Sequence, residues 1–156
     1  MRATRSGSLL NRDELAAWRG FLRVHAALFR ELDGELQAEH NLPLSSYEVL
    51  LTLHGAPGGE MRMSEIADSV LLSRSGLTRL VDRLERDGLL ERRECTTDKR
   101  GANAAITEEG RRRFEAARET HLGGVRARFL ERLGPEDLRR LGETWERVLP
   151  GAVTRD

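Results

Sequence analysis

Segment 73–86 carries arginine and hydroxyl side chains at helical spacing. Its apolar residues recur every three to four positions, which predicts an amphipathic helix with one buried stripe and one solvent face. The predicted buried stripe is Leu77, Leu80, Val81 and Leu84. The predicted solvent face is Arg74, Ser75, Thr78, Arg79, Asp82, Arg83 and Arg86, with Ser73 as N-cap. Because arginine pairs bidentately with guanine and hydroxyl groups bind bases or phosphates, this face has the side chains of a DNA reader.

A predicted β-hairpin follows this helix, with strands at 89–95 and 102–106. Its polar tip contains Asp98, Lys99, Arg100 and Gly101. Lys99 and Arg100 give the tip positive charge, which suits the narrow, electronegative minor groove of DNA. We expect Asp98 to brace Arg100. Phosphate repels Asp82, so we expect that carboxylate to orient an arginine of its own helix, namely Arg79, Arg83 or Arg86.

The elements before the hairpin have the order of a winged helix-turn-helix. A helix is predicted to begin with Ser45 as N-cap and Glu48 as its reciprocal partner, and to end at Gly55. Residues 56–59 form a turn, and a short helix covers 64–70. A tight turn then leads to the helix capped by Ser73, which is the one that enters the major groove in this motif.

Long helices are predicted on both sides of this lobe. Asn11 and Glu14 form a capping pair, after which apolar residues recur at steps of three and four up to Leu36. Thr107 caps a second helical region, with a predicted bend at Gly123-Gly124 and a restart at 134–135. A seam of this period packs against other helices, from the same chain or from a second subunit. The fold class expected is mainly α.

The domain organisation expected is a single unit over 1–156. Its winged helix-turn-helix lobe spans 45–107, and its dimerisation helices span 11–40 and 108–150. Only 38% of the residues are hydrophobic and 4% aromatic, so a second copy of the chain is expected to complete the apolar core. We therefore expect a homodimer.

Charge and composition exclude several classes of function for this chain. Lys+Arg and Asp+Glu are both 26, so any affinity for DNA must come from local charge. No apolar run approaches a membrane span, and the single cysteine fits a reducing compartment, so we expect a cytoplasmic protein without membrane contact. The sequence has no phosphate-binding loop, nucleophile elbow or cluster at metal-ligand spacing. We therefore expect no enzyme activity, no cofactor and no metal site.

Cys95 leaves a redox interpretation open. Arg92 and Arg93 lie close to it in sequence and could lower the pKa of an exposed thiol, whose oxidation would disturb the hairpin. The alternative is an inert cysteine.

Five segments together resemble the MarR family of bacterial transcriptional regulators. They are MSEIA at 63–67, LSRSGLTRLVDRLE at 72–85, GLLERR at 88–93, DKR at 98–100 and ITEEG at 106–110. The resemblance implies a two-fold dimer that binds a pseudo-palindromic operator in double-stranded DNA, more often as a repressor than as an activator. It also implies that 73–86 is the recognition helix, that Arg100 is the wing arginine and that Asp98 is its partner.

Members of this family commonly respond to small aromatic or anionic effectors, bound where the dimerisation helices meet the DNA-binding lobe. Candidate effector-binding residues here are Trp18, His25, Tyr47 and His54, which are amphipathic side chains on helices expected at that junction. The alternative for each is ordinary interior or interface packing. The alternative function is a dimeric winged-helix module that binds a protein instead of specific DNA, which the zero net charge would allow.

Overall fold

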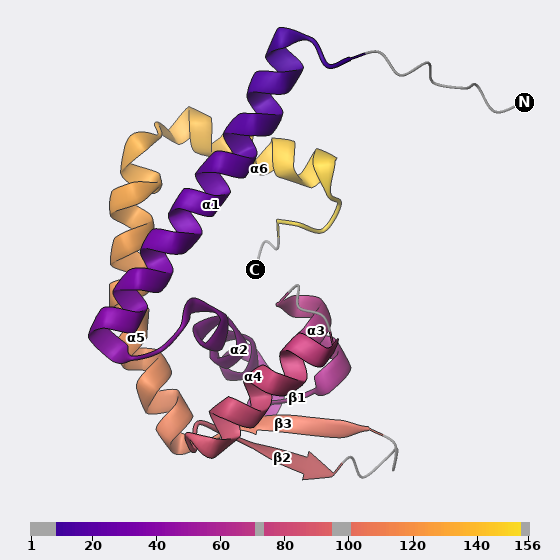
Figure 1. Cartoon of the computed structure of the whole chain (residues 1–156), viewed down its shortest axis with the longest axis vertical. Coiled ribbons are helices and arrows are strands. Elements are labelled where there is room, and N and C mark those ends of the chain that lie inside the picture. The colour runs from indigo at the N-terminus through magenta and orange to yellow at the C-terminus, as the bar shows by residue number, and fades with distance from the viewer. Residues whose placement is uncertain (1–8, 71–73, 95–100, 154–156) are drawn as a thin grey trace, which may run out of the picture.

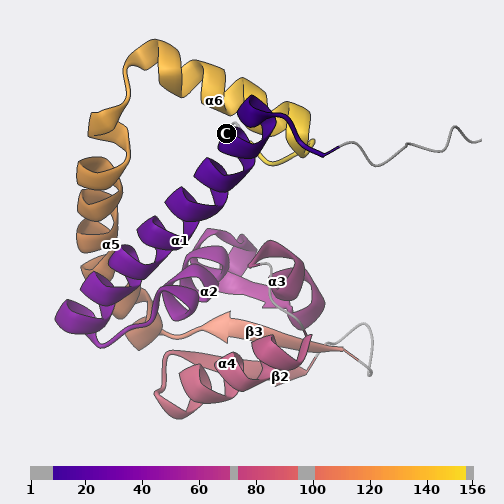
Figure 2. The same cartoon turned by 45° about the horizontal axis from the view of Figure 1, so that its top comes forward.

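The computed structural model describes residues 9–70, 74–94 and 101–153 of the chain. Two long helices, α1 (Arg12–His40) and α5 (Glu108–Arg128), lie side by side and form one arm of the molecule (Figure 1). The last helix, α6 (Pro135–Val148), crosses near the start of α1, at the end of that arm away from the sheet (Figure 2). No helix in the described ranges is long and apolar enough to span a membrane.

The remaining elements form the lobe below the arm. They are α2 (Leu44–Gly55), the 3₁₀ turn η1 (Pro57–Gly59), β1 (Glu60–Arg62), α3 (Met63–Ser69), α4 (Arg74–Arg86), β2 (Leu90–Glu94) and β3 (Ala102–Ile106). The three strands form one antiparallel sheet in the order β1-β3-β2. The mainly α fold and its winged helix-turn-helix order are as predicted from the sequence.

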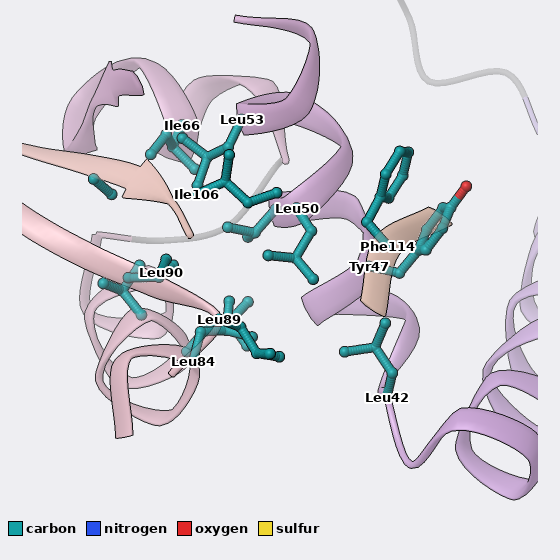
Figure 3. Packing of buried hydrophobic residues seen from close by; sticks show 14 of the residues in the cluster. Leu42, Tyr47, Leu50, Leu53, Ile66, Leu84, Leu89, Leu90, Ile106 and Phe114 are labelled. Atoms are coloured by element: carbon teal, nitrogen blue, oxygen red, sulfur yellow. The ribbon is translucent and has the colours of Figure 1, made fainter. Parts of the chain in front are cut away.

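Helix α2 is the centre of the core. Its Leu50 and Leu53 side chains meet Ile66 of α3 and Ile106 of β3, and all four are buried (Figure 3). Its Tyr47 ring stacks on Phe114 of α5, with ring centroids 5.3 Å apart. Helix α2 therefore contacts both the arm and the lobe.

Capping explains where several helices begin and end. The Asn11 side chain accepts hydrogen bonds from the backbone of Asp13 and Glu14, and Glu14 accepts one from the Asn11 backbone, which is the predicted capping box. Thr107 caps α5 as predicted, because its Oγ1 accepts a hydrogen bond from the Gly110 backbone. The same hydroxyl donates to the Gly88 carbonyl at 2.6 Å, so it also joins α5 to the end of α4.

The predicted start of the second helix is wrong. Ser45 lies inside the first turn of α2, whose N-cap is Pro43 and has no side-chain cap bond. The Asp33 carboxylate of α1 instead accepts the Leu44 N–H at 2.7 Å. A group from another helix thus satisfies a donor that the local sequence assigns to a serine.

The glycine pair of α5 does not break the helix where a bend was predicted. The α-helix continues to Arg128, and the 3₁₀ turn η2 (Leu130–Arg132) follows it. A Cβ on Gly124 would lie 2.7 Å from Leu32 and 2.6 Å from the Glu35 carboxylate, both on α1. The absence of a side chain there permits close packing of two helices.

Candidate nucleic-acid interface

Helix α4 buries one face and exposes the other, as predicted. Leu77, Leu80, Val81 and Leu84 are each no more than 6% exposed. Thr78, Arg79, Arg83 and Arg86 all lie on the exposed face. The helix ends as predicted around Gly88, where the Leu89 N–H returns to the Leu84 carbonyl at 2.9 Å.

The arginines on this face lack the carboxylate partners that several arginines elsewhere in the chain have. Arg128 binds Glu31 and Glu35, and Arg139 binds Glu136 and Glu143. In contrast, three arginines of α4 form no ion pair with any residue whose placement is described, namely Arg79, Arg83 and Arg86. The exposed face of α4 therefore presents three guanidinium groups that no described carboxylate neutralises, although the net charge of the chain is zero.

The prediction that Asp82 orients one of these arginines is wrong. Its carboxylate binds the guanidinium of Arg92 on β2, with Oδ1 2.5 Å from Nη2. Glu85, one turn further along α4, binds the other end of the same guanidinium. The hydrogen bonds that Arg92 donates to Asp82 and Glu85 hold the pKa of Arg92 above its ordinary value, with the bond to Asp82 the larger cause.

The Arg83 side chain contacts α2 within the lobe. Its Nη2 donates to the Oγ of Ser46, a buried residue in the first turn of α2, at 3.4 Å. Ser45, Gly76, Arg79 and Arg83 line a shallow hollow of about 240 Å³ between α2 and α4. Guanidinium groups, serine hydroxyls and helix N-termini all bind phosphate oxygens, and this hollow has all three.

Several predicted contact residues fall outside the described placement. Helix α4 contains Arg74 and Ser75 in its first turn, but the positions of their side chains are not described. Ser73 and the hairpin residues Asp98, Lys99 and Arg100 lie outside the described residues altogether, as does Cys95. Residues 95–100 connect β2 to Gly101 and β3, and both of these paired strands are described.

The two arginines beside Cys95 in sequence are already bound. Arg92 binds carboxylates of α4, and Arg93 binds Glu91 at 2.6 Å and Glu60 at 2.9 Å. Hydrogen bonds to Glu91 and Glu60 raise the pKa of Arg93 above its ordinary value. Their positive charge is therefore compensated, which weakens the redox interpretation of the cysteine.

Two of the predicted effector-binding residues lie together on α2. The Tyr47 ring is buried between Phe114 and His121 of α5, with its centroid 4.5 Å from that of His121. His54 packs on Phe114 and its Nε2 lies 3.3 Å from Glu115. Burial raises the pKa of Tyr47, against the lowering effect of Arg118, and burial lowers the pKa of His121. These rings fill the α2–α5 contact.

The other two candidates lie on α1, in a different place. Trp18 is 54% exposed and contacts Phe21, while His25 lies between Phe21 and Phe29 along the helix. Thus the four candidates do not converge on one cavity. His25 does line an apolar groove of about 620 Å³ between α1, η2 and α6.

That groove is about twice the volume of the hollow of about 310 Å³ between α3, α4 and β3, and it has almost no polar lining. Phe21 and Val24 line it from α1, Phe129 from the end of α5, and Leu141 and Trp145 from α6. The described ranges contain no group of three or more potential metal ligands.

Comparison with known proteins gives consistent results. A family model described as "MarR family" matches residues 40–101. The structure of AbsC, a MarR family transcriptional regulator from Streptomyces coelicolor, is 33% identical with a TM-score of 0.86, over 90% of this chain and 95% of AbsC. A second MarR family transcriptional regulator from that organism, in complex with DNA, is 32% identical with a TM-score of 0.89, over 97% of this chain and 94% of that chain.

A curated relative agrees with the solved structures. The HTH-type transcriptional repressor YetL from Bacillus subtilis (strain 168) is 29% identical over 115 residues, which cover 71% of this chain and 68% of YetL.

Proposed function

The chain belongs to the MarR family of transcriptional regulators, and we propose that it represses transcription as a homodimer bound to a pseudo-palindromic operator. The observation that carries this proposal is the exposed face of α4, where Arg79, Arg83 and Arg86 have no carboxylate partner among the described residues. The second Streptomyces coelicolor regulator, which is similar over nearly the whole chain, was solved in complex with DNA.

In this proposal α4 lies in the major groove. Thr78 and Arg79 face the base edges, together with Ser75 from the first turn of the helix. Arg83, held against Ser46, and the hollow beside it contact the phosphate backbone, which fixes the register of the helix. The hairpin segment with Lys99 and Arg100 contacts the neighbouring minor groove. Phosphate contacts supply most of the affinity and base contacts the specificity.

The second subunit is proposed to cover the apolar groove of the arm. Phe21 and Val24, which line this groove, are 44% and 51% exposed in the single chain, and Leu138 of α6 is 37% exposed. An apolar surface of this kind on long helices is typical of a subunit interface. The dimer would place two α4 helices on one face of a DNA duplex.

Release from DNA is proposed to depend on a small aromatic or anionic effector at the junction of arm and lobe. Tyr47 and His54 of α2 lie at this junction, packed against Phe114 of α5. An effector acts only if it binds the arrangement of α4 helices that does not fit DNA better than the arrangement that does. We place the protein in the cytoplasm, where its DNA would be.

Selection of bound sequences from a random duplex library tests the proposed function and identifies the operator in the same experiment. We expect enrichment of an inverted repeat whose half-sites are about one helical turn, roughly 10 base pairs, apart. The alternative, a winged-helix module that binds another protein, predicts no enriched sequence. Enrichment of an isolated half-site would contradict the homodimer.

A further inference from the structure

Arg92 of β2 connects the hairpin to the recognition helix through three contacts. Its Nη2 is 2.5 Å from Asp82 Oδ1, and its Nη1 donates to Glu85 Oε2. The backbone N–H of Arg92 also donates to Glu85 Oε1, at 3.1 Å. Asp82 and Glu85 are three positions apart and therefore project from the same side of α4. One residue of the hairpin is thus held at both its backbone and its side chain by one face of α4, which lies along β2 (Figure 2).

The next residue of the strand fixes the opposite side of the sheet. Successive strand side chains point to opposite faces, so Arg93 points away from the contacts of Arg92. It binds Glu60 of β1, and the same Glu60 accepts a hydrogen bond from Asn103 of β3 at 2.7 Å. The strands are therefore tied to one another on one face and to α4 on the other.

These ion pairs contribute more to geometry than to stability. The Arg92 side chain is 30% exposed and its partners are more exposed, and ion pairs at this level of exposure contribute little to the free energy of unfolding. A planar guanidinium that binds two carboxylates at once does, however, restrict orientation strongly. Since both carboxylates come from α4, Arg92 fixes the orientation of β2 relative to that helix.

We propose that Arg92 is a positioning residue for DNA binding, which sets the hairpin relative to α4 so that major-groove and minor-groove contacts form together. This inference rests on the proposed function. Asp82 and Glu85 are its counterparts on α4, and none of the three binds DNA itself. The role explains why a helix proposed to approach phosphates keeps two carboxylates on its exposed surface.

Asp82→Asn tests the proposal because electrostatics and positioning predict opposite results. Loss of a negative charge near phosphates strengthens DNA binding if charge alone matters. Loss of the bridge weakens it, and we expect about a tenfold loss of operator affinity, which corresponds to about 1.4 kcal/mol. The matched control is Asp87→Asn, since Asp87 is exposed just after α4 and has no ion pair within the described residues. This control should bind the operator at least as tightly as the unmodified protein.

A double-mutant cycle with Arg100→Ala identifies the route of the effect. If the bridge acts by positioning the hairpin, Asp82→Asn costs little affinity once the wing contact has been removed, so the two losses are not additive. Arg92→Met, which keeps the apolar stem, should give the same pattern. Urea unfolding of each variant, followed by circular dichroism, should give midpoints equal to that of the unmodified protein.

Three results would overturn the proposal. They are operator binding by Asp82→Asn as tight as that of Asp87→Asn, additive losses in the cycle, and a loss of affinity no larger than the unfolded fraction explains. If the unmodified protein showed no preference for any operator, that result would contradict the proposed function, before any variant is compared in the double-mutant cycle.

Discussion

Gly110, at the start of α5, is the position where one added methyl group should most disturb the joint between arm and lobe. A Cβ there would lie 2.0 Å from the Leu89 carbonyl oxygen and 2.8 Å from Ile106 Cγ1. The first distance is about 1.4 Å short of the 3.4 Å at which ordinary contact begins. A backbone oxygen cannot rotate away as a side chain can, so strand and helix would have to separate.

The expected change in the free energy of unfolding of Gly110→Ala has three contributions. Overpacking of a buried site costs about 1–3 kcal/mol. The Leu89 carbonyl also accepts the Thr107 N–H at 3.1 Å, and loss of that bond costs about 1 kcal/mol more. Alanine favours the helix over glycine by about 1 kcal/mol, which offsets part of the cost. Gly110→Ala should therefore lower the free energy of unfolding by about 1–3 kcal/mol, or Tm by roughly 2–12 °C.

Gly123→Ala is the matched control, because it changes the same residue type in the same helix. No atom lies within 4 Å of the Cβ position at Gly123, so only the helix preference acts and stability should rise by about 0.5–1 kcal/mol. Urea unfolding followed by circular dichroism at one fixed protein concentration measures both, since dimerisation makes stability concentration-dependent. Equal stability of the two variants would refute the close-approach explanation of Gly110.

Three further predictions concern DNA binding, pH and assembly. Arg79→Ala should reduce the preference for operator over random DNA, whereas Arg100→Ala should weaken binding to both; competition binding measures the two ratios, and equal ratios would contradict the division of roles. Burial lowers the pKa of His121, and its Nδ1 has no described hydrogen-bond partner, so protonation of this ring opposes folding. The free energy of unfolding should therefore be highest above pH 6.5 and should decrease as the pH falls below 6.5. His121→Phe should remove that part of the pH dependence of the urea midpoint, and unchanged pH dependence would contradict this. Val24→Glu should give monomers with weak operator affinity in sedimentation and binding assays, and Ala116→Glu, on an exposed site outside the groove, should remain dimeric; dimeric Val24→Glu would exclude the proposed interface.

The features that were predictable from the sequence are local ones. The capping box of Asn11 and Glu14 involves residues three positions apart, and the buried stripe of α4 follows from the 3.6-residue period. The Thr107 cap is local in the same way. Such features depend on the chain within one or two helical turns, so the neighbouring residues alone specify them.

The features that were missed depend on contacts between different helices and strands. Asp33 caps α2 from another helix, and Asp82 pairs with Arg92 across the turn between α4 and β2. Strand β1 has three residues and exists because β3 pairs with it, so it has no periodicity of its own to detect. The spacing of Asp82 and Glu85 on one side of α4 was the one available signal for the bridge to the hairpin.

Fluorescence anisotropy measures whether the exposed face of α4 binds specific DNA. The labelled duplex is the DNA upstream of the protein's own gene, and a shuffled duplex is the comparison, each across a salt series. We expect tight binding to the upstream DNA, a clear preference over the shuffled duplex, and a steep loss of affinity as salt rises. Absence of binding to either duplex, even at low salt, would contradict the assignment of the exposed α4 face to DNA.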